Sequence, residues 1–193
     1  MRSWGGRLAV LLVVAASLGC AATPRGQAPT YAWYTKATGQ AVFADIQAQE
    51  GADDQGPEEG FGLTVGWVDA VSYDDAWGVE GTFEQSYPSL SGGGGGRYSR
   101  YMAGMRHVWD LDEKVKTALS FGAAWHAIRF SDASHDYSID GFGLWVGYGF
   151  EFALSERWWL GVGGKLHGWR GRNQFERDYE LSTVFDLGIS YYF

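Results

Sequence analysis

Acidic and basic residues recur in this chain at even spacings within segments, as expected for side chains on one face of a β-strand. Ten of them share the face on which small and polar residues also fall: Asp45, Glu80, Glu84, Arg100, Arg106, Lys116, Glu151, Lys165, Glu180 and Asp186. His126 and His167 fall on the same face. Six acids and four bases predict a paired network, because unpaired buried charges are costly. The alternative is a proton or small-ion path in which an arginine and a glutamate exchange partners.

A second group of residues has the side-chain types of a hydrolase. The polar segment in question contains Ser131, Asp132, Ser134, His135 and Asp136, which supply a nucleophile, a base and an acid. Such residues are also ordinary in polar loops, and the His-x-Ser-Asn arrangement of lipid A deacylases is missing from the sequence. The four histidines have neither helical i, i+4 spacing nor a neighbouring cysteine. We therefore expect no enzymatic activity, no metal and no cofactor, with a lipid A deacylase-like hydrolase as an alternative.

The composition favours an all-β protein and excludes some classes of partner. The chain has 29 Gly together with 10 Trp, 11 Tyr and 11 Phe, a combination typical of close-packed strands that carry large side chains. Its net charge of -8, from 15 Lys plus Arg and 23 Asp plus Glu, repels phosphate backbones, so we expect no nucleic-acid partner. The single cysteine, Cys20, excludes an intramolecular disulfide.

The N-terminal residues have the pattern of an export signal. Arg2 and Arg7 precede a short apolar run and then small residues, which predicts a signal peptide over residues 1–22. The sequence Ser17-Leu18-Gly19-Cys20 resembles the lipobox of bacterial lipoproteins, and this resemblance implies possible acylation of Cys20. The alternative is ordinary cleavage near Ala21 or Ala22, in which Cys20 is discarded. Residues 23–39 are predicted to form a periplasmic linker.

The body of the chain has the two-residue period of β-strands, most clearly over residues 142–154 and 179–193, where every second residue is large and apolar. Matching this period along the chain predicts eight strands: 40–49, 61–70, 77–87, 98–109, 114–130, 139–154, 157–169 and 179–193. Long polar connections at 50–60, 88–97, 131–138 and 170–178 alternate with short ones at 72–76, 110–113 and 155–156. This alternation, and the even number of strands, are typical of outer-membrane barrels.

A soluble ligand-carrying barrel such as a lipocalin would also have eight antiparallel strands. The interior of an eight-stranded barrel is only wide enough for side chains to fill. It could not enclose the large residues of all strands, so rows such as Trp77, Val79 and Phe83 must face outward, toward lipid. Aromatic residues near the predicted strand ends indicate two interfacial girdles, namely Trp77, Trp109, Trp158 and Tyr191 at the short turns and Tyr87, Tyr101, Trp169 and Tyr179 at the long loops.

The last strand carries the most specific pattern. A polar residue, a glycine two places on, an aromatic residue and a terminal aromatic residue occupy Asp186, Gly188, Tyr191 and Phe193. This spacing resembles the assembly signal of bacterial outer-membrane barrels. Residues 40–193 resemble the small barrels of the OmpA transmembrane domain and OmpX type, which implies an all-β, eight-stranded antiparallel up-and-down transmembrane β-barrel.

The resemblance implies a bacterial outer-membrane location, with both barrel termini in the periplasm. It also implies outer-membrane lipid, lipopolysaccharide and the barrel assembly machinery as partners, and a monomer. Arg170, Arg172 and Arg177 could meet lipopolysaccharide phosphates. The expected function is an outer-membrane barrel with a polar, packed lumen and a role in envelope integrity or surface interaction. The alternatives are the lipid-modifying hydrolase and a narrow channel for small solutes or ions.

Overall fold

The structure is a computed structural model of the 193-residue chain. It describes residues 31–44, 58–72, 75–88, 95–112, 114–131, 136–172 and 177–193. The predicted signal peptide, with Cys20, lies outside these residues. Among the residues described, no helix is long and apolar enough to cross a membrane.

The described residues form eight β-strands, as the sequence predicts. Their bounds are β1 Tyr31–Ala44, β2 Glu58–Ser72, β3 Asp75–Ser86, β4 Gly95–Asp112, β5 Val115–Ser131, β6 Asp136–Ala153, β7 Trp158–Arg172 and β8 Arg177–Tyr192. A tilted strand needs about 9–11 residues to cross the hydrocarbon core of a bilayer. Each strand is long enough to do so.

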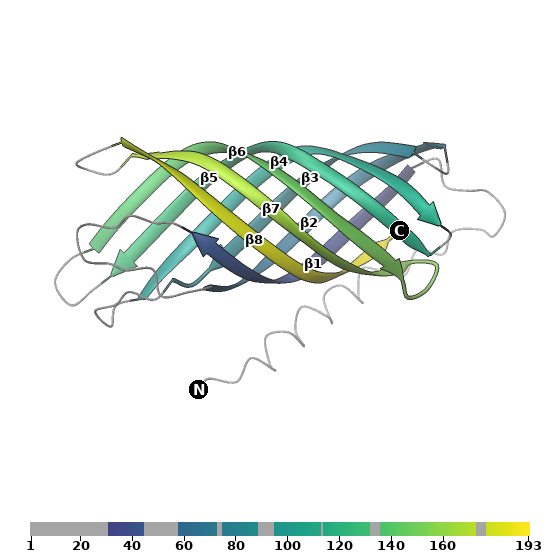
Figure 1. Ribbon diagram of the computed structural model, residues 1–193, viewed down its shortest axis with the longest axis horizontal. Helices are drawn as coiled ribbons and strands as arrows, with labels where there is room; N and C mark the ends of the chain where they lie inside the picture. The colour runs from purple at the N-terminus through teal and green to yellow at the C-terminus, as the bar shows by residue number, and fades with distance from the viewer. Residues whose placement is uncertain are drawn as a thin grey trace, which may run out of the picture.

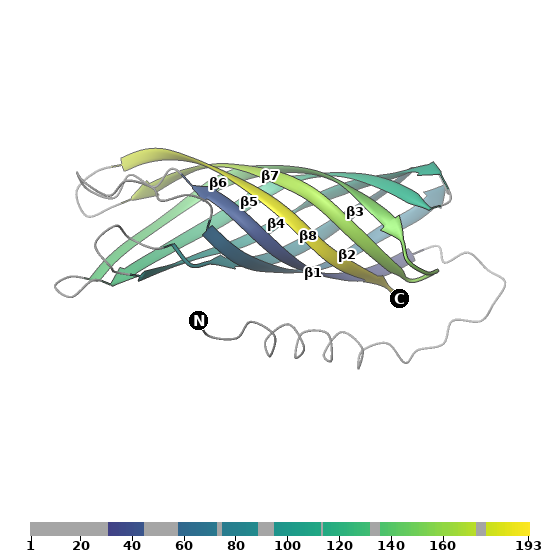
Figure 2. The same cartoon turned by 60° about the horizontal axis from the view of Figure 1, so that its bottom comes forward.

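Each strand pairs antiparallel with the next, and β1 pairs with β8, so the sheet closes into a barrel (Figures 1 and 2). The strands run obliquely around the long axis of the barrel. Closure gives every strand two hydrogen-bonded neighbours, which is the condition for a sheet to cross lipid. We call the end at which β8 finishes the C-terminal end, and the opposite end, at which β1, β3, β5 and β7 finish, the loop end.

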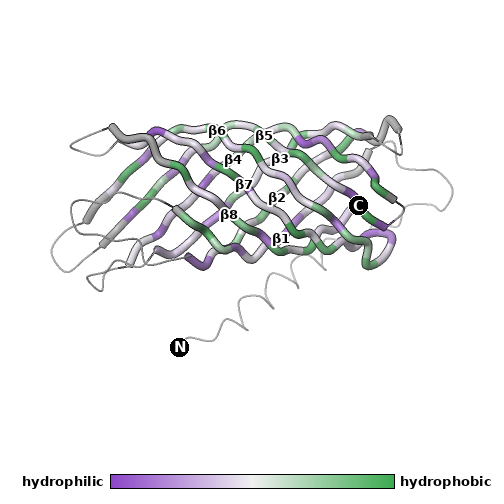
Figure 3. Tube along the Cα trace, viewed as in Figure 1, coloured by the Kyte–Doolittle hydropathy of each residue, from purple (hydrophilic) through white to green (hydrophobic). Residues whose placement is uncertain are grey.

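The two faces of the sheet differ in character, and polar and apolar residues alternate along the strands (Figure 3). On β6 the odd-numbered residues Gly143, Trp145 and Gly147 are buried inside the barrel, whereas Leu144 is 66% exposed on the outside. The outward-facing large residues include Val65, Trp77, Val79, Tyr101, Trp125, Phe142, Val162, Leu166, Leu181 and Phe185. The apolar band therefore faces lipid, as the volume argument predicts.

The first strand lies earlier in the chain than the sequence predicts. β1 begins at Tyr31 and ends at Ala44, so the predicted strand 40–49 is wrong in its bounds, and residues 31–39 belong to the barrel instead of to the predicted linker. In β1 the outward positions Thr35, Ala37, Gly39 and Ala41 are small. This strand therefore lacks the alternation of large apolar residues by which the others are recognised.

Two predicted features of the loop end are also corrected. The long connections expected at 131–138 and 170–178 shorten to the intervals 132–135 and 173–176, because β5 to β8 extend further. Trp169, expected in the outer aromatic girdle, is buried in the lumen. It falls on the same face of β7 as Lys165 and His167, and that face points inward.

The lumen as candidate functional site

The centre of the lumen contains a chain of alternating charges contributed by five strands. Arg100 Nε lies 3.0 Å from Glu84 Oε2, and both side chains are fully buried. Lys165 Nζ donates to Glu84 Oε1 at 2.6 Å and to Asp186 Oδ2 at 2.9 Å. Lys36 Nζ donates to Asp186 Oδ1 at 3.4 Å. Each carboxylate thus lies between two cations, and the network links β4, β3, β7, β8 and β1.

A second network lies nearer the C-terminal end and is centred on Arg106. Its Nη2 atom donates to Glu151 Oε1 at 2.7 Å, and its Nη1 atom lies 3.5 Å from Glu80 Oε2. The Tyr34 hydroxyl donates to Glu80, and the Tyr192 hydroxyl donates to Glu151 Oε2 at 2.7 Å. The Arg106 guanidinium also lies over the Tyr34 ring, 4.7 Å from its centroid. The two carboxylates are therefore satisfied by both charge and hydroxyl donors.

Lys116 lies nearest the C-terminal end among the predicted lumen bases. Its Nζ atom is 4.4 Å from the centroid of the Trp159 ring and 5.3 Å from that of Tyr192. The aromatic faces attract the ammonium group electrostatically. Lys116 therefore interacts with aromatic rings, whereas the other predicted lumen bases form ion pairs with carboxylates.

The loop end of the lumen is filled mainly by apolar side chains. Six buried residues form one cluster, namely Val42, Tyr98, Ile128, Ile139, Trp169 and Val184. His126 packs on this cluster, and the Tyr98 hydroxyl is hydrogen-bonded to His126 Nδ1 at 2.6 Å. The His167 ring lies perpendicular to that of His126, with centroids 5.6 Å apart. This apolar layer covers the central charges from the loop end.

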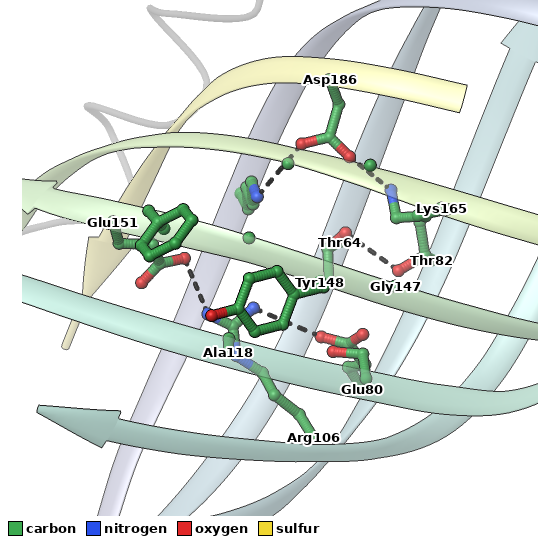
Figure 4. A pocket seen from close by; sticks show the side chains of 16 residues that line it. Thr64, Glu80, Thr82, Arg106, Ala118, Gly147, Tyr148, Glu151, Lys165 and Asp186 are labelled. Carbon is green, nitrogen blue, oxygen red and sulfur yellow. Dashed lines mark hydrogen bonds and ion pairs between the residues drawn. The ribbon is translucent and has the colours of Figure 1, made fainter. Parts of the chain in front are cut away.

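A small cavity lies between the two networks, with a volume of about 40 Å³. Its charged walls come from Lys36, Glu80, Arg106, Glu151, Lys165 and Asp186. Figure 4 shows the last five of these around it, together with Thr64 and Thr82, whose hydroxyl groups lie 2.9 Å apart. A space of this size with several polar partners suits ordered water. The lumen therefore holds room for solvent between packed layers.

The structure places eight of the ten predicted lumen charges inside the barrel: Glu80, Glu84, Arg100, Arg106, Lys116, Glu151, Lys165 and Asp186. Asp45 lies outside the described residues, and of Glu180 the structure describes the place in β8 but not the side chain. The sequence analysis missed Lys36, Tyr34 and Gln40, whose Oε1 accepts from Arg100 Nη2 at 3.2 Å. All three lie on β1. Tyr34 and Lys36 precede the predicted strand 40–49, and the even-numbered residues of β1 face inward, whereas the prediction of Asp45 in the lumen requires the odd-numbered ones.

The four residues of the predicted assembly signal divide between the two faces of β8. Asp186 and Gly188 face the lumen, whereas Tyr191 and Phe193 face outward. The Tyr191 ring contacts Trp158 and Phe193, with centroid distances of 4.8 and 5.2 Å. The two aromatic residues therefore form an outer cluster with β7 at the C-terminal end.

The hydrolase candidates cannot be assembled from described side chains. Asp132, Ser134 and His135 lie outside the described residues, while Ser131 ends β5 and Asp136 begins β6 without described side chains. Within the described parts of the chain, no group of three or more His, Cys, Asp or Glu residues is placed to hold a metal ion. The hydrolase alternative stays a prediction.

Solved structures similar to this chain are small outer-membrane barrels. Ail, the attachment invasion locus protein of Yersinia pestis, is 19% identical, with a TM-score of 0.57 over 84% of this chain and 97% of Ail. Neisserial surface protein A is 15% identical, with a TM-score of 0.58 over 87% of this chain and all of that protein. OprG of Pseudomonas aeruginosa is 11% identical, with a TM-score of 0.53 over 89% and 99% of the two chains.

The sequence matches no curated protein, but it matches a family model. The model is that of the outer membrane protein beta-barrel domain, and the match covers residues 9–193. The match spans all eight strands, and it agrees with the closed antiparallel barrel and its apolar outer face. The chain therefore belongs to the outer membrane protein beta-barrel domain family and is a protein of the bacterial outer membrane.

Proposed function

We propose that this chain is a non-enzymatic outer-membrane barrel whose lumen is closed, and that it acts through its outer surface in envelope integrity or surface contacts. The observation that carries the proposal is the side-chain packing of the described part of the lumen, in which the cavity between the two networks has a volume of about 40 Å³. The central network from Arg100 to Lys36 and the network around Arg106 both join strands across the barrel. An apolar layer covers them at the loop end.

The lumen is packed too tightly to serve as a wide pathway for solutes. The interior of an eight-stranded barrel is only wide enough for its own side chains, and the cavity of about 40 Å³ has the size of a water site. Moving a solute past Glu84 would require Arg100 or Lys165 to leave a buried carboxylate, which is strongly unfavourable. The outer surface is then the part of the molecule available for interaction.

The functions of similar barrels support a role in surface contacts. Ail is an attachment invasion locus protein, and one of its structures is a complex with the heparin analogue sucrose octasulfate. Another similar barrel is a Neisserial surface protein. We propose the same general class of role for this chain.

Both barrel termini are assigned to the periplasm, and the loop end to the cell exterior. The even number of strands places the two ends of the barrel chain on one side. The outward cluster of Tyr191 and Phe193 lies on that side and suits recognition by the barrel assembly machinery. Closure of β1 on β8 leaves no free strand edge for pairing between copies, which supports a monomer.

Conductance in planar bilayers tests the closed lumen. The purified protein should give a current indistinguishable from that of the empty bilayer, under conditions in which an open porin gives discrete steps. Reproducible steps from the folded barrel would overturn the closed lumen in favour of the narrow channel. Outer-membrane fractionation and heat-modifiable gel migration verify that the protein used is the folded barrel.

Incubation with lipid A tests the absence of enzymatic activity. Mass spectrometry should find the acyl chains of lipid A unchanged after incubation with the folded protein in detergent. Loss of an acyl chain would favour the hydrolase, and a Ser134→Ala or His135→Ala variant would then identify the residues responsible.

A further inference from the structure

Two arginines lie directly opposite each other on the outward face of the barrel, near the loop end. Arg97 of β4 is the register partner of Arg129 of β5, and both side chains are exposed. Like charges placed directly opposite on neighbouring strands repel and destabilise the sheet. An anion bound between them would remove this repulsion.

The neighbouring strand fixes one of the two guanidinium groups. Arg129 Nη1 lies 3.0 Å from Asp140 Oδ1 and also donates to the Ser138 hydroxyl. Arg97 has no carboxylate partner among the described residues. The pair therefore consists of one positioned guanidinium and one that is available to a ligand.

The outward side chains of β4 and β5 change in a fixed order from the loop end toward the middle of the barrel. The small residues Ser99 and Ala127 lie opposite each other below the arginines, and Tyr101 and Trp125 form the next outward pair. Tyr101 is 54% exposed and Trp125 is 49% exposed. Four residues of a strand span roughly 13 Å, so charged and aromatic rows lie at successive depths. This order matches an amphiphile with an anionic headgroup above and hydrocarbon below.

The charge on this face favours a phosphate monoester. The pair carries two positive charges, one of which lies beside Asp140. Arg170 lies in the register row of Phe142, Trp125 and Tyr101, away from the pair. A phosphate monoester carries about -1.5 to -2 charges at pH 7, whereas the phosphodiester of a phospholipid carries one. The planar guanidinium also presents two parallel N–H groups to phosphate oxygens.

We propose that Arg97 and Arg129 form a binding site for a phosphate monoester of lipid A, the phosphorylated glycolipid of the outer leaflet, with its acyl chains over Tyr101 and Trp125. The site rests on the proposed orientation, in which the loop end faces the exterior, but not on the state of the lumen. It differs in position from the predicted phosphate contacts of Arg170, Arg172 and Arg177: Arg170 lies on β7, and the side chains of Arg172 and Arg177 lie outside those described.

The test is lipid retention by the full-length folded protein in detergent, measured by native mass spectrometry. The probes are lipid A with both phosphate monoesters, dephosphorylated lipid A and phosphatidylglycerol. Arg97→Gln and Arg129→Gln should each lower retention of lipid A roughly tenfold, the effect of losing a charge-assisted interaction. Arg97→Lys should recover it only in part, because lysine keeps the charge but loses the planar fork.

The matched control is Lys114→Gln, which removes one positive charge from the turn between β4 and β5 at the other end of the barrel. It should leave lipid A retention unchanged. Equal retention by wild type and Arg97→Gln would overturn the site, and so would equal retention of lipid A and phosphatidylglycerol. Heat-modifiable migration verifies folding of each variant. Because retention does not depend on conductance, failure of this site and failure of the closed lumen are distinguishable.

Discussion

The imidazole ring of His126 lies parallel to the indole ring of Trp169, with an interplanar angle of 4° and 4.7 Å between their centroids. This stack belongs to the apolar layer that fills the lumen at the loop end. Trp169→Ala would leave a cavity there, because the barrel wall cannot collapse onto so large a space. The expected loss in the free energy of unfolding is about 3–5 kcal/mol. Urea titration in lipid vesicles, followed by heat-modifiable migration, measures it.

Trp33→Ala is the matched control for this substitution. Trp33 is 57% exposed on the outside of β1, so its removal leaves no internal cavity and should cost about 1 kcal/mol. Equal losses for the two tryptophans would contradict the structural role assigned to the layer.

Lys165 is the base that links two carboxylates, and its replacement should be costly. Lys165→Met leaves Glu84 and Asp186 with one cation fewer in the buried network. Removing one partner of a buried ion pair typically destabilises by about 3–5 kcal/mol. The exposed Lys114→Met variant should cost about 0.5 kcal/mol or less. The same urea titration compares them.

A double variant separates the charge effect from lost packing. Glu84→Gln combined with Lys165→Met removes both charges of the closest pair, and the loss should be smaller than the sum of the two single losses, by about 0.5–3 kcal/mol. Strict additivity would mean that the two groups are not coupled.

Two glycines on the barrel wall should respond oppositely to alanine. A Cβ atom at Gly104 would clash with the Phe121 carbonyl oxygen and lie 2.9 Å from Cζ2 of the buried Trp145 ring, whereas nothing lies within 4 Å of a Cβ at Gly168 on the outer face. Gly104→Ala should destabilise by about 1–3 kcal/mol through overpacking. Gly168→Ala should be neutral or slightly stabilising. Equal effects would contradict the close approach of Phe121 and Trp145 to Gly104.

Phe193 should matter more for assembly than for stability. Phe193→Ala removes an outward ring from the cluster with Tyr191. Assembly into vesicles that contain the barrel assembly machinery should slow, while urea stability of the folded fraction changes little. Leu187→Ala, on the same outward face of β8, is the control. Equal assembly rates for the two variants would contradict a signalling role.

Most of the fold follows from periodicity alone. The strands β6 and β8 are recognisable because Leu144, Val146, Leu187 and Ile189 lie on one face and small or polar residues on the other. The barrel closure then follows from the number of strands and the need to satisfy both edges. The strand bounds follow less well from periodicity, because polar residues at the loop end extend the hydrogen-bonded strand pairing beyond the apolar band.

Lumen residues could be predicted on the strands whose bounds could be predicted. Glu84, Arg100 and Lys165 fall on a recognisable inward face, but their pairing depends on the register between strands, which periodicity does not specify. Lys36 was missed because the outward face of β1 is small and the strand has no apolar signature. Trp169 has the aromatic character of a girdle residue near a strand end, but it shares the inward face of β7 with Lys165.

The pairing of β1 with β8 has a consequence for the order of assembly. The Phe193 N–H donates to the Trp33 carbonyl at 2.9 Å, and the β1–β8 ladder joins residues about as far apart in sequence as the barrel allows. The seam therefore cannot close until the last strand has reached the membrane. Until then the edge of β1 carries unpaired backbone groups, each costing several kcal/mol in lipid. Insertion of this chain should accordingly be a concerted event of the whole barrel, with partly synthesised chains held outside the bilayer.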